Sequence, residues 1–150
     1  MKKVVTISLG SSKHDFTFET PFLGQRFQIR RLGADDDTTK AWELLRRQQA
    51  YADAIGLGEI GDHYHVGQST LLNKETKRLL NVVTRVPVTT GATLRRLLQV
   101  RAVRWVHKEL GHYFNNNIVL FLNGMRNWDM AMALSEYTKN LSFADALLQT

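Results

Sequence analysis

The sequence predicts an α/β fold with three layers, in which a mainly parallel, Rossmann-like sheet carries an antiparallel hairpin after its first strand. Short runs of β-branched or apolar residues stop at a glycine, and a stretch with helical spacing usually follows. The four runs are VVTISLG, ending at Gly10, DAIGLG, ending at Gly58, VPVTTG, ending at Gly91, and IVLFLNG, ending at Gly124. A glycine at such a junction allows a sharp turn and leaves backbone amides open to a ligand.

The first third of the chain predicts a strand, a hairpin and a helix. Residues 3–9 form the strand, and residues 14–20 and 25–32 alternate apolar and polar side chains on either side of a turn at residues 21–24. This pattern predicts a hairpin with one buried and one solvated face. A loop at residues 33–39 precedes a helix in which Trp42 and Leu45 share the inner face. We interpret the acidic run Asp35, Asp36 and Asp37 as capping of that helix in preference to metal binding.

The middle of the chain predicts two further strands with a hairpin and a helix between them. Residues 52–58 form a short buried strand, and a small hairpin follows around residues 64–67. Asn73 is placed to cap a helix that carries Leu79 and Val83 on its inner face. Pro87 then opens a strand over residues 86–91, as suits a proline at the start of a strand.

A long helix is predicted from residue 94 to about residue 110, with Thr93 as its cap and Gly111 at its end. Its arginines are expected to face outward. The side chains expected to face inward are Leu94, Leu97, Leu98, Ala102, Trp105 and Val106.

The last third predicts one strand and two helices. Residues 118–122, IVLFL, are the most apolar run and are expected to form a central strand buried on both faces. A turn at 123–127 leads to a helix over 128–137, and a weaker helix is expected over 141–148. Residues 1–150 are therefore interpreted as a single α/β domain, with the N-terminal part of a longer protein as an alternative.

Composition limits the classes of protein to which the chain can belong. At 150 residues with 43% hydrophobic side chains, the chain can build one apolar core. Cysteine is absent, which excludes disulfides, thiolate catalysis and cysteine-ligated metals. The N-terminus predicts a strand and not a signal peptide, and no run reaches the ~18 apolar residues of a membrane helix. We expect a cytoplasmic protein without a membrane partner.

The charge balance points to anionic partners. Twenty Lys and Arg against 14 Asp and Glu give a net charge of +6, and the isoelectric point is about 9.8. A basic cluster in the long helix consists of Arg95, Arg96, Arg101, Arg104 and Lys108. It is either a solvated helix face or, together with Trp105 and His107, a surface for nucleic acid.

The loops that follow the strands form the first candidate site. In a parallel sheet the carboxyl ends of the strands meet at one edge, where amides, hydroxyls and a helix start favour an anion. The candidate ligand-binding residues are Gly10, Ser11, Ser12, Gly58, Thr89, Thr90, Gly91, Gly124 and Arg126. The alternative is that these glycines and hydroxyls serve turn geometry and helix capping only.

Two other motifs are weaker. GLGEIG at residues 56–61 has the spacing of a dinucleotide fingerprint, but the residues after it predict a strand and not the required helix. His63 and His65 would share one face of a strand next to Asp62, yet no third ligand is evident, so we assign no metal site.

Five segments of the chain occur in the following order: VVTISLGSSKHD, RRLGADDD, ADAIGLGEI, VPVTTGATLRR and IVLFLNGMRNWDMAMAL. Together they resemble the N-terminal half of bacterial proteins known as quinate 5-dehydrogenases, and the resemblance covers nearly the whole chain. It implies NAD(P)-dependent oxidation of a cyclic polyol acid. The lysine–aspartate pair and the glycine-rich cofactor loop of quinate and shikimate dehydrogenases have no match here, so catalytic residues stay unassigned.

The sequence thus leads to one main functional hypothesis and two alternatives. The main hypothesis is that the strand ends bind an anionic metabolite or nucleotide, as part of a dehydrogenase-like oxidoreductase with NAD(P) as its cofactor. The first alternative is a non-enzymatic nucleic-acid-binding module that uses the basic helix. The second is a structural domain that associates with itself as a homo-oligomer.

Overall fold

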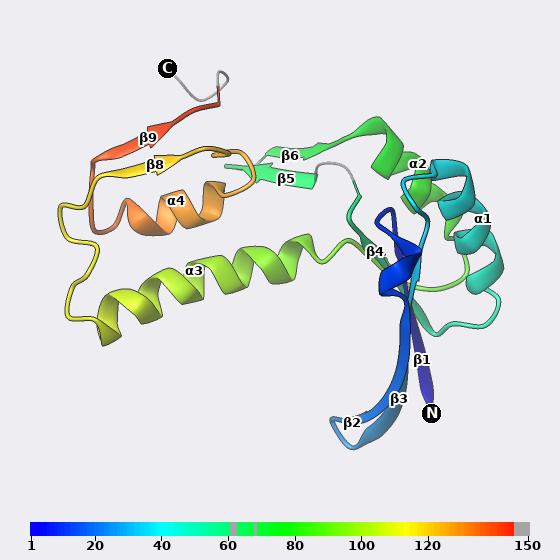
Figure 1. The fold of residues 1–150 in the computed structure, drawn as a ribbon. Coiled ribbons are helices and arrows are strands. Elements are labelled where there is room, and N and C mark those ends of the chain that lie inside the picture. Colours follow the sequence, from blue (N-terminus) through cyan, green and yellow to red (C-terminus); the bar gives the residue numbers. More distant parts are fainter. Residues whose placement is uncertain (61–62, 68, 146–150) are drawn as a thin grey trace. The chain divides into compact units, whose positions relative to one another are not determined.

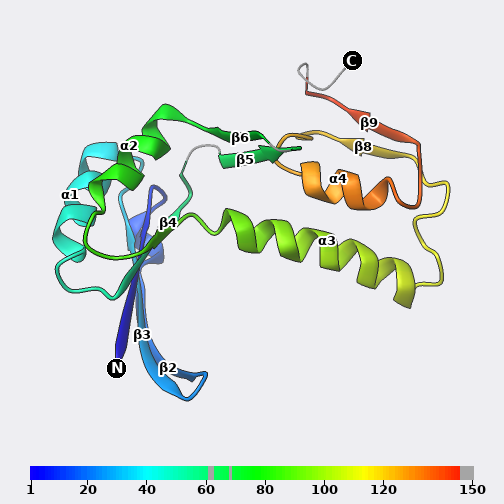
Figure 2. The ribbon, with the colours of Figure 1, turned by 180° about the vertical axis from the view of Figure 1, so that it is seen from behind.

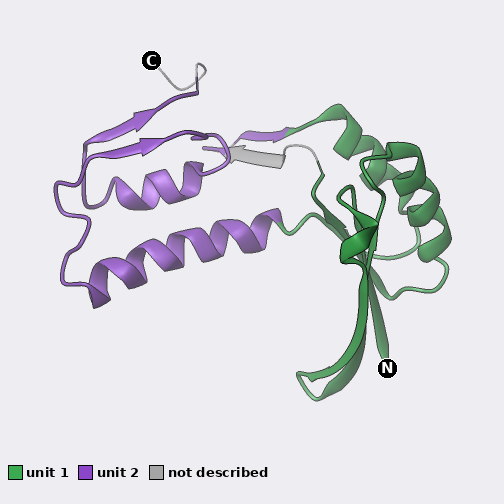
Figure 3. Ribbon diagram, in the orientation of Figure 1, with its two compact units in different colours: residues 1–61, 72–91 green, residues 62–71, 92–150 purple. Residues whose placement is uncertain are grey.

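The protein is described from a computed structural model, which covers residues 1–60, 63–67 and 69–145, without the side chains of residues 63–65. The chain contains two compact units, shown in Figure 3. Unit 1 comprises residues 1–61 and 72–91, and unit 2 comprises residues 62–71 and 92–150.

Unit 1 is built on a five-stranded mixed sheet with the strand order β2-β3-β1-β4-β7. β1 (Lys2–Ser8) pairs in parallel with β3 (Gln25–Gly33) and β4 (Ala54–Gly58), and β4 pairs in parallel with β7 (Val88–Thr89). β2 (Phe16–Phe22) runs antiparallel to β3 at one edge, and the short 3-10 helix η1 (Ser12–His14) joins β1 to β2 (Figure 1). The expected α/β class, the mostly parallel sheet and the hairpin after the first strand are confirmed.

Two capped helices cover one face of this sheet (Figures 1 and 2). α1 (Thr38–Gln48) begins where the Asp37 carboxylate accepts from the amides of Thr39 and Lys40. α2 (Lys74–Val82) begins in the same way at Asn73, whose side chain accepts from the amides of Glu75 and Thr76. Both caps agree with the prediction, because an Asp or Asn side chain satisfies amides that the helix itself leaves unpaired.

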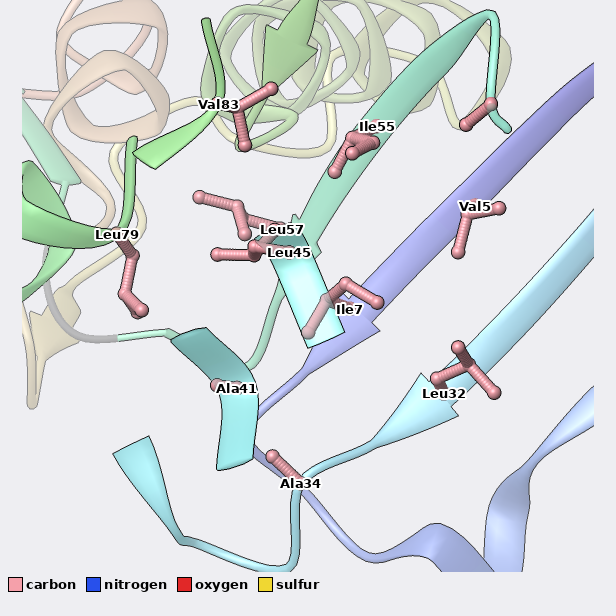
Figure 4. Close-up of a cluster of buried hydrophobic side chains, with 11 residues drawn as sticks. Val5, Ile7, Leu32, Ala34, Ala41, Leu45, Ile55, Leu57, Leu79 and Val83 are labelled. Carbon is pink, nitrogen blue, oxygen red and sulfur yellow. The ribbon is translucent and has the colours of Figure 1, made fainter. Parts of the chain in front are cut away.

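The core of unit 1 lies between the sheet and these helices. Alternate residues of the strands point into it, because successive side chains of a strand lie on opposite faces. Figure 4 shows the cluster, in which Leu45 of α1 and Leu79 of α2 pack over Ile7 and Ile55 of the sheet. All four side chains are almost fully buried.

The described residues of unit 2 form two helices and two small sheets. α3 (Ala92–Glu109) is followed by β8 (Val119–Phe121), α4 (Trp128–Leu134) and β9 (Leu141–Phe143), and β8 pairs in parallel with β9. β5 (His63–Val66) and β6 (Ser69–Leu72) form the second two-stranded sheet, where a small hairpin was expected. A separate apolar cluster around Val103, Phe121 and Leu134 forms the core.

The IVLFL segment is not a central strand of the main sheet, as the sequence predicted. β8 pairs with β9 in a two-stranded sheet of unit 2. Phe121 is buried, whereas Ile118, Leu120 and Leu122 are exposed. The segment therefore alternates between an open face and a covered one, on which Phe121 packs in the apolar cluster of unit 2. The helix expected over 141–148 is also wrong at its start, because residues 141–143 form β9; residues 146–148 lie outside the described residues.

The predicted inner face of the long helix is wrong. The side chains expected inside are mostly exposed, whereas the buried residues of α3 are Ala92, Val103 and His107. The helix begins at Ala92, so Thr93 lies within its first turn and is not its cap. Gly111 has a φ of +62° just beyond the end, as predicted for a glycine that terminates a helix.

Two smaller expectations also differ from the structure. The hairpin strand β2 has no buried face, because it lies at the sheet edge with Phe16 and Phe18 exposed. Trp42, expected to be inside with Leu45, is 40% exposed and packs under the guanidinium of Arg46.

Candidate functional site

The loops after β1, β3 and β4 meet at the carboxyl edge of the unit 1 sheet. The strand order reverses at β1, because the chain goes first to β3 on one side and then, through α1, to β4 on the other. Ligands of open α/β sheets bind at such a reversal, outside the carboxyl ends of the strands. The loop amides interlock there: Leu9 donates to Gly58 O (3.1 Å), and Ala34 donates to Ser8 O (2.8 Å).

Arg31 is the centre of this edge. It lies on the sheet face opposite the core, and its side chain is only 11% exposed. Nη1 donates to the carbonyl of Ser11 (2.9 Å) and to Asp15 Oδ1 (3.3 Å), and Nη2 donates to Ser8 Oγ (3.0 Å) and to Glu59 Oε1 (3.2 Å). We call Ser8, Gly10, Ser11, Arg31 and Glu59 the Arg31 site.

Glu59 closes the Arg31 site from the β4 side. Its side chain is 62% exposed, and its backbone has a φ of +49°, a left-handed conformation that is rare for residues other than glycine. The carboxylate lies against Gly10, where a Cβ would overlap it. A bare Cα at Gly10 therefore gives a carboxylate room to reach Arg31.

Gly33 permits the closest backbone approach at this edge. A Cβ at Gly33 would lie 2.5 Å from Ser11 C and from Ser12 N. The Gly33 amide donates to Asp15 Oδ1 (2.6 Å), so the same carboxylate ties β3 to Arg31. The loop after β1 thus packs directly on the end of β3.

Asp37 of the acidic run caps α1, as predicted, whereas Asp35 also binds the loop after β1. Asp35 and Asp36 both have positive φ, and Asp35 accepts from Ser12 N (2.6 Å) and Lys40 Nζ (2.6 Å). The hydrogen bond from Lys40, followed by that from the Ser12 amide, holds the pKa of Asp35 well below its usual range. The structure shows no group of three or more potential metal-ligating side chains among the residues it describes.

The sequence-predicted site residues fall into two groups. Gly10, Ser11, Ser12 and Gly58 come together at the carboxyl edge around Arg31. Thr89 is the last residue of β7, the next strand of the same sheet, and Thr90 and Gly91 follow it. Gly124 and Arg126 follow β8 and belong to unit 2.

The three glycine amides that were expected to hold an anion are hydrogen-bonded within the chain. Gly10 N donates to Ser8 Oγ (3.1 Å), Gly91 N donates to Thr89 Oγ1 (3.1 Å), and Gly124 N donates to Asp145 Oδ2. An anion at the carboxyl edge would therefore depend on a cationic side chain more than on these amides.

Sequence reasoning missed Arg31, Ser8, Asp15 and Gly33, and it placed Glu59 in a strand-end loop without giving it a role. One signal was available for Arg31, because alternation along β3 places it opposite the buried Leu32, at the end of a strand. Its partners come from segments 16 to 28 residues away in sequence, so only the fold reveals them.

Residues 56–60 of the GLGEIG segment do not form the phosphate-binding turn of a dinucleotide fold. Gly56 and Gly58 pack β4 against β1, since Cβ atoms there would lie 3.0 Å from Thr6 Oγ1 and 3.5 Å from Ser8 Cβ. The next element is the strand β5, as predicted. The described residues of this segment therefore do not fit NAD(P). Gly61 and Asp62 lie outside the described residues, as do the side chains of His63 and His65.

The basic cluster of α3 is partly neutralised within unit 2. Arg96 pairs with Asp129 (3.7 Å) and Arg104 with Glu136 (2.6 Å). The hydrogen bond from Arg104 lowers the pKa of Glu136 and raises that of Arg104. His107 is buried against Tyr137 and lies 3.2 Å from His112 through ring nitrogens, so it is a core residue and not part of an open basic face.

Two family models match successive parts of the chain, and the first match includes residues 62–71 of unit 2 as well as most of unit 1. Residues 3–90 match a family model described as Domain of unknown function (DUF8753), and this match covers more than half of the chain. The chain belongs to the DUF8753 family. Residues 93–150 match a second model, Domain of unknown function (DUF8754). The DUF8753 match ends one residue before the unit boundary at Gly91.

No curated protein and no solved structure matches the chain. The helices of the described residues include none that is long and apolar enough to cross a membrane.

Proposed function

We propose that the DUF8753 region binds a small anionic metabolite or nucleotide at the Arg31 site. The observation that carries this proposal is the guanidinium of Arg31, nearly buried at the point where the strand order reverses. Arginine suits such a role because its planar fork of donors matches carboxylate and phosphate groups.

Electrostatics dictate how such a ligand would enter. Arg31 already contacts two carboxylates, Asp15 and Glu59, so an additional anion would be repelled. Glu59 is the more exposed of the two carboxylates. It follows β4, which lies on the other side of β1 from β3, the strand that carries Arg31. In this proposal the ligand displaces Glu59 and takes over its contact with Arg31, next to the bare Cα of Gly10.

A dehydrogenase-like activity, with NAD(P) as cofactor and a Rossmann-like three-layer arrangement, is the finer form of this proposal. Its support is the resemblance described above and the parallel sheet of unit 1. The GLGEIG segment supplies no dinucleotide turn, so the chemistry proposed for the Arg31 site is binding of an anionic group, and catalytic residues stay unassigned.

A thermal-shift screen with NAD, NADP, nucleotides and hydroxy acids tests the proposal. A ligand present at about a hundred times its dissociation constant stabilises the folded state by about 2.7 kcal/mol. This corresponds to a rise in Tm of several degrees for a chain of this size. The absence of any shift across the panel would contradict the proposal.

Two variants connect a positive result to the Arg31 site. Glu59→Gln removes the competing charge, so the same ligand should give a larger shift than in the unmodified chain. Arg31→Lys should reduce the shift, since an ammonium lacks the planar fork. The matched control is Glu19→Gln, which changes the exposed pair of Glu19 and Arg26 on the hairpin. Equal shifts in the Glu59 and Glu19 variants would place the ligand elsewhere.

Nucleic-acid binding through α3 is the second candidate function. The observation that favours it is the exposed face on which Trp105 lies near Arg101 and Lys108 at helical spacing. A salt titration checks it, because each phosphate contact adds to the loss of affinity with salt. Charge reversal at Arg101 should abolish this binding and leave a ligand of the Arg31 site unaffected.

A further inference from the structure

A second cationic feature of unit 1 lies between α1 and α2, outside the Arg31 site. Two adjoining hollows of about 480 and 500 Å³ run along the two helices. Both are lined by Trp42, Arg78 and Asn81, so they form one continuous depression. We call it the α1–α2 groove.

The groove is held in shape at both ends by contacts between the helices. At one end Thr38 Oγ1 donates to Glu75 Oε1 (2.7 Å). At the other end Gln49 donates to Val82 O (3.2 Å), and its side-chain oxygen accepts from the amides of Thr84 (3.0 Å) and Arg85 (3.3 Å). A ligand would therefore find the walls already positioned, which reduces the entropy lost on binding.

Its lining combines an aromatic ring with uncompensated positive charge. Trp42 is 40% exposed, and the guanidinium carbon of Arg46 lies 4.6 Å from the centre of its ring. Arg78 lines both hollows, Arg46 and Arg85 line the second, and Glu75 lines the first. Within the described part of the chain, none of these three arginines has a carboxylate within 4.0 Å, unlike Arg96 and Arg104 of α3.

Positive and negative charges lie at opposite ends of α1, and this separation favours an anion at the end of the groove that contains Arg46. α1 starts at the carboxyl edge, after β3, and ends at the amino edge, before β4. The carboxylates of residues 35–37 stand at its start, and Arg46 and Arg47 stand in its last turn. An anion is thus attracted to the end of the groove formed by Arg46, Arg78 and Arg85.

We propose that the α1–α2 groove binds nucleotides of single-stranded nucleic acid, with a base against Trp42 and phosphates on Arg78 and Arg85. Aromatic rings beside a basic channel are the usual means of binding single strands, because every base has a flat face to stack. The two adjoining hollows, with arginines at one end, favour successive nucleotides over a single small anion. This proposal does not depend on the Arg31 site.

Fluorescence anisotropy of a labelled twelve-residue oligothymidylate tests the proposal on the full chain. The double variant Arg78→Gln/Arg85→Gln should weaken binding at least tenfold. It should also reduce the slope of log affinity against log salt by about 1.4, since each contact to a single strand contributes about 0.7. Trp42→Ala should weaken binding by about tenfold or more, the usual effect of losing one stacked base.

Control variants separate this site from the rival surfaces. Lys2→Gln/Arg26→Gln removes two exposed charges of the sheet outside the groove and should leave the affinity for the oligonucleotide unchanged. Arg101→Gln/Lys108→Gln tests the rival surface on α3, where a loss of binding would place the oligonucleotide instead. Trp42→Phe retains an aromatic ring and should restore most of the binding lost in Trp42→Ala. Circular dichroism melting of each variant distinguishes loss of binding from loss of folding, and the arginine pair gives the answer if Trp42→Ala does not fold.

Three results would overturn the proposal. The first is no binding of the oligonucleotide by the unmodified chain. The second is unchanged affinity in Arg78→Gln/Arg85→Gln, and the third is loss of binding in the α3 variant instead. Competition with AMP and with a duplex of the same length identifies the source of the nucleotide, and preference for either over the single strand would contradict the inference.

Discussion

At the scale of single residues, the carboxyl edge of unit 1 depends on the absence of two side chains. Gly33 lets the loop after β1 lie directly on the end of β3, and Gly10 leaves room for the carboxylate of Glu59. The two positions differ in the atoms that an added side chain would contact. A side chain at Gly33 meets backbone, whereas one at Gly10 meets the flexible end of Glu59.

Gly33→Ala should therefore destabilise the protein. The added Cβ would lie 2.5 Å from the backbone of Ser11 and Ser12, and overpacking of this kind costs about 1–3 kcal/mol. Urea unfolding followed by circular dichroism measures the change. Gly58→Ala is the control, since its Cβ would make only ordinary contacts of 3.5 Å or more; equal destabilisation of both variants would show that the close approach is not the cause.

Residues with local roles could be predicted from the sequence, and residues with long-range roles could not. Asn73 and Asp37 cap the helices that follow them, because a cap involves only the next two or three residues. Arg31 acquires its role from Ser8, Ser11, Asp15 and Glu59, which three separate segments supply. The pattern of parallel strands predicted that the ends of β1 and β4 meet, but it did not identify the side chains that contact one another there.

At the scale of elements, α3 shows that hydrophobic periodicity can predict a helix without predicting which of its faces is buried. Its apolar residues occupy both sides of the helix: Leu94, Leu98 and Trp105 on one, Val100 and Val103 on the other. Periodicity fixes the existence of the helix but does not choose between two apolar faces. Packing against α4 decides, and it buries the side that carries Val103.

Val103→Ala and Leu98→Ala should have different effects, although Leu98 is the larger residue. Val103 is 5% exposed and Leu98 is 55% exposed. Removal of buried methyl groups should lower the free energy of unfolding by about 1–3 kcal/mol, whereas an exposed substitution should change it by about 0.5 kcal/mol or less. Thermal unfolding of the two variants measures this, and a larger effect of Leu98→Ala would show that the opposite face of α3 is covered.

Strands that depend on local sequence signals were predicted correctly, and strands that depend on pairing with a distant segment were not. β1 and the hairpin of β2 and β3 agree with prediction, because alternation and a turn are local signals. β9 has only three residues and exists as a strand through pairing with β8, so the helical pattern expected there was overridden. The IVLFL segment was expected in the main sheet because apolar content alone does not tell a strand of one sheet from a strand of another.

At the scale of the whole molecule, the two units differ in the size of their cores. Among the residues whose side chains the structure describes, eleven buried apolar residues form the cluster of unit 1 and five form that of unit 2. The sheet of unit 1 has five strands, whereas β8 and β9 stand as a pair of three residues each. Small sheets are marginally stable, so the units should open with different free energies.

Hydrogen exchange followed by mass spectrometry should show this difference. Amides in the ladders of β1 with β3 and β4 should exchange at least tenfold more slowly than those of β8 and β9. Slow exchange reports a large opening free energy, and partial opening of unit 2 would leave unit 1 protected. Uniform protection across both units would indicate that the chain unfolds in one cooperative step.

The alternating exposure of residues 118–122 has a practical consequence for handling the protein. In this segment an extended row of apolar side chains is exposed to solvent: Ile118, Leu120 and Leu122. Segments of this kind, rich in β-branched and aliphatic residues and free of charge and proline, seed self-association when concentrated. Replacing Leu120 by lysine would place a gatekeeper charge in the row and leave the buried Phe121 untouched, which makes it the first substitution to try when preparing concentrated samples.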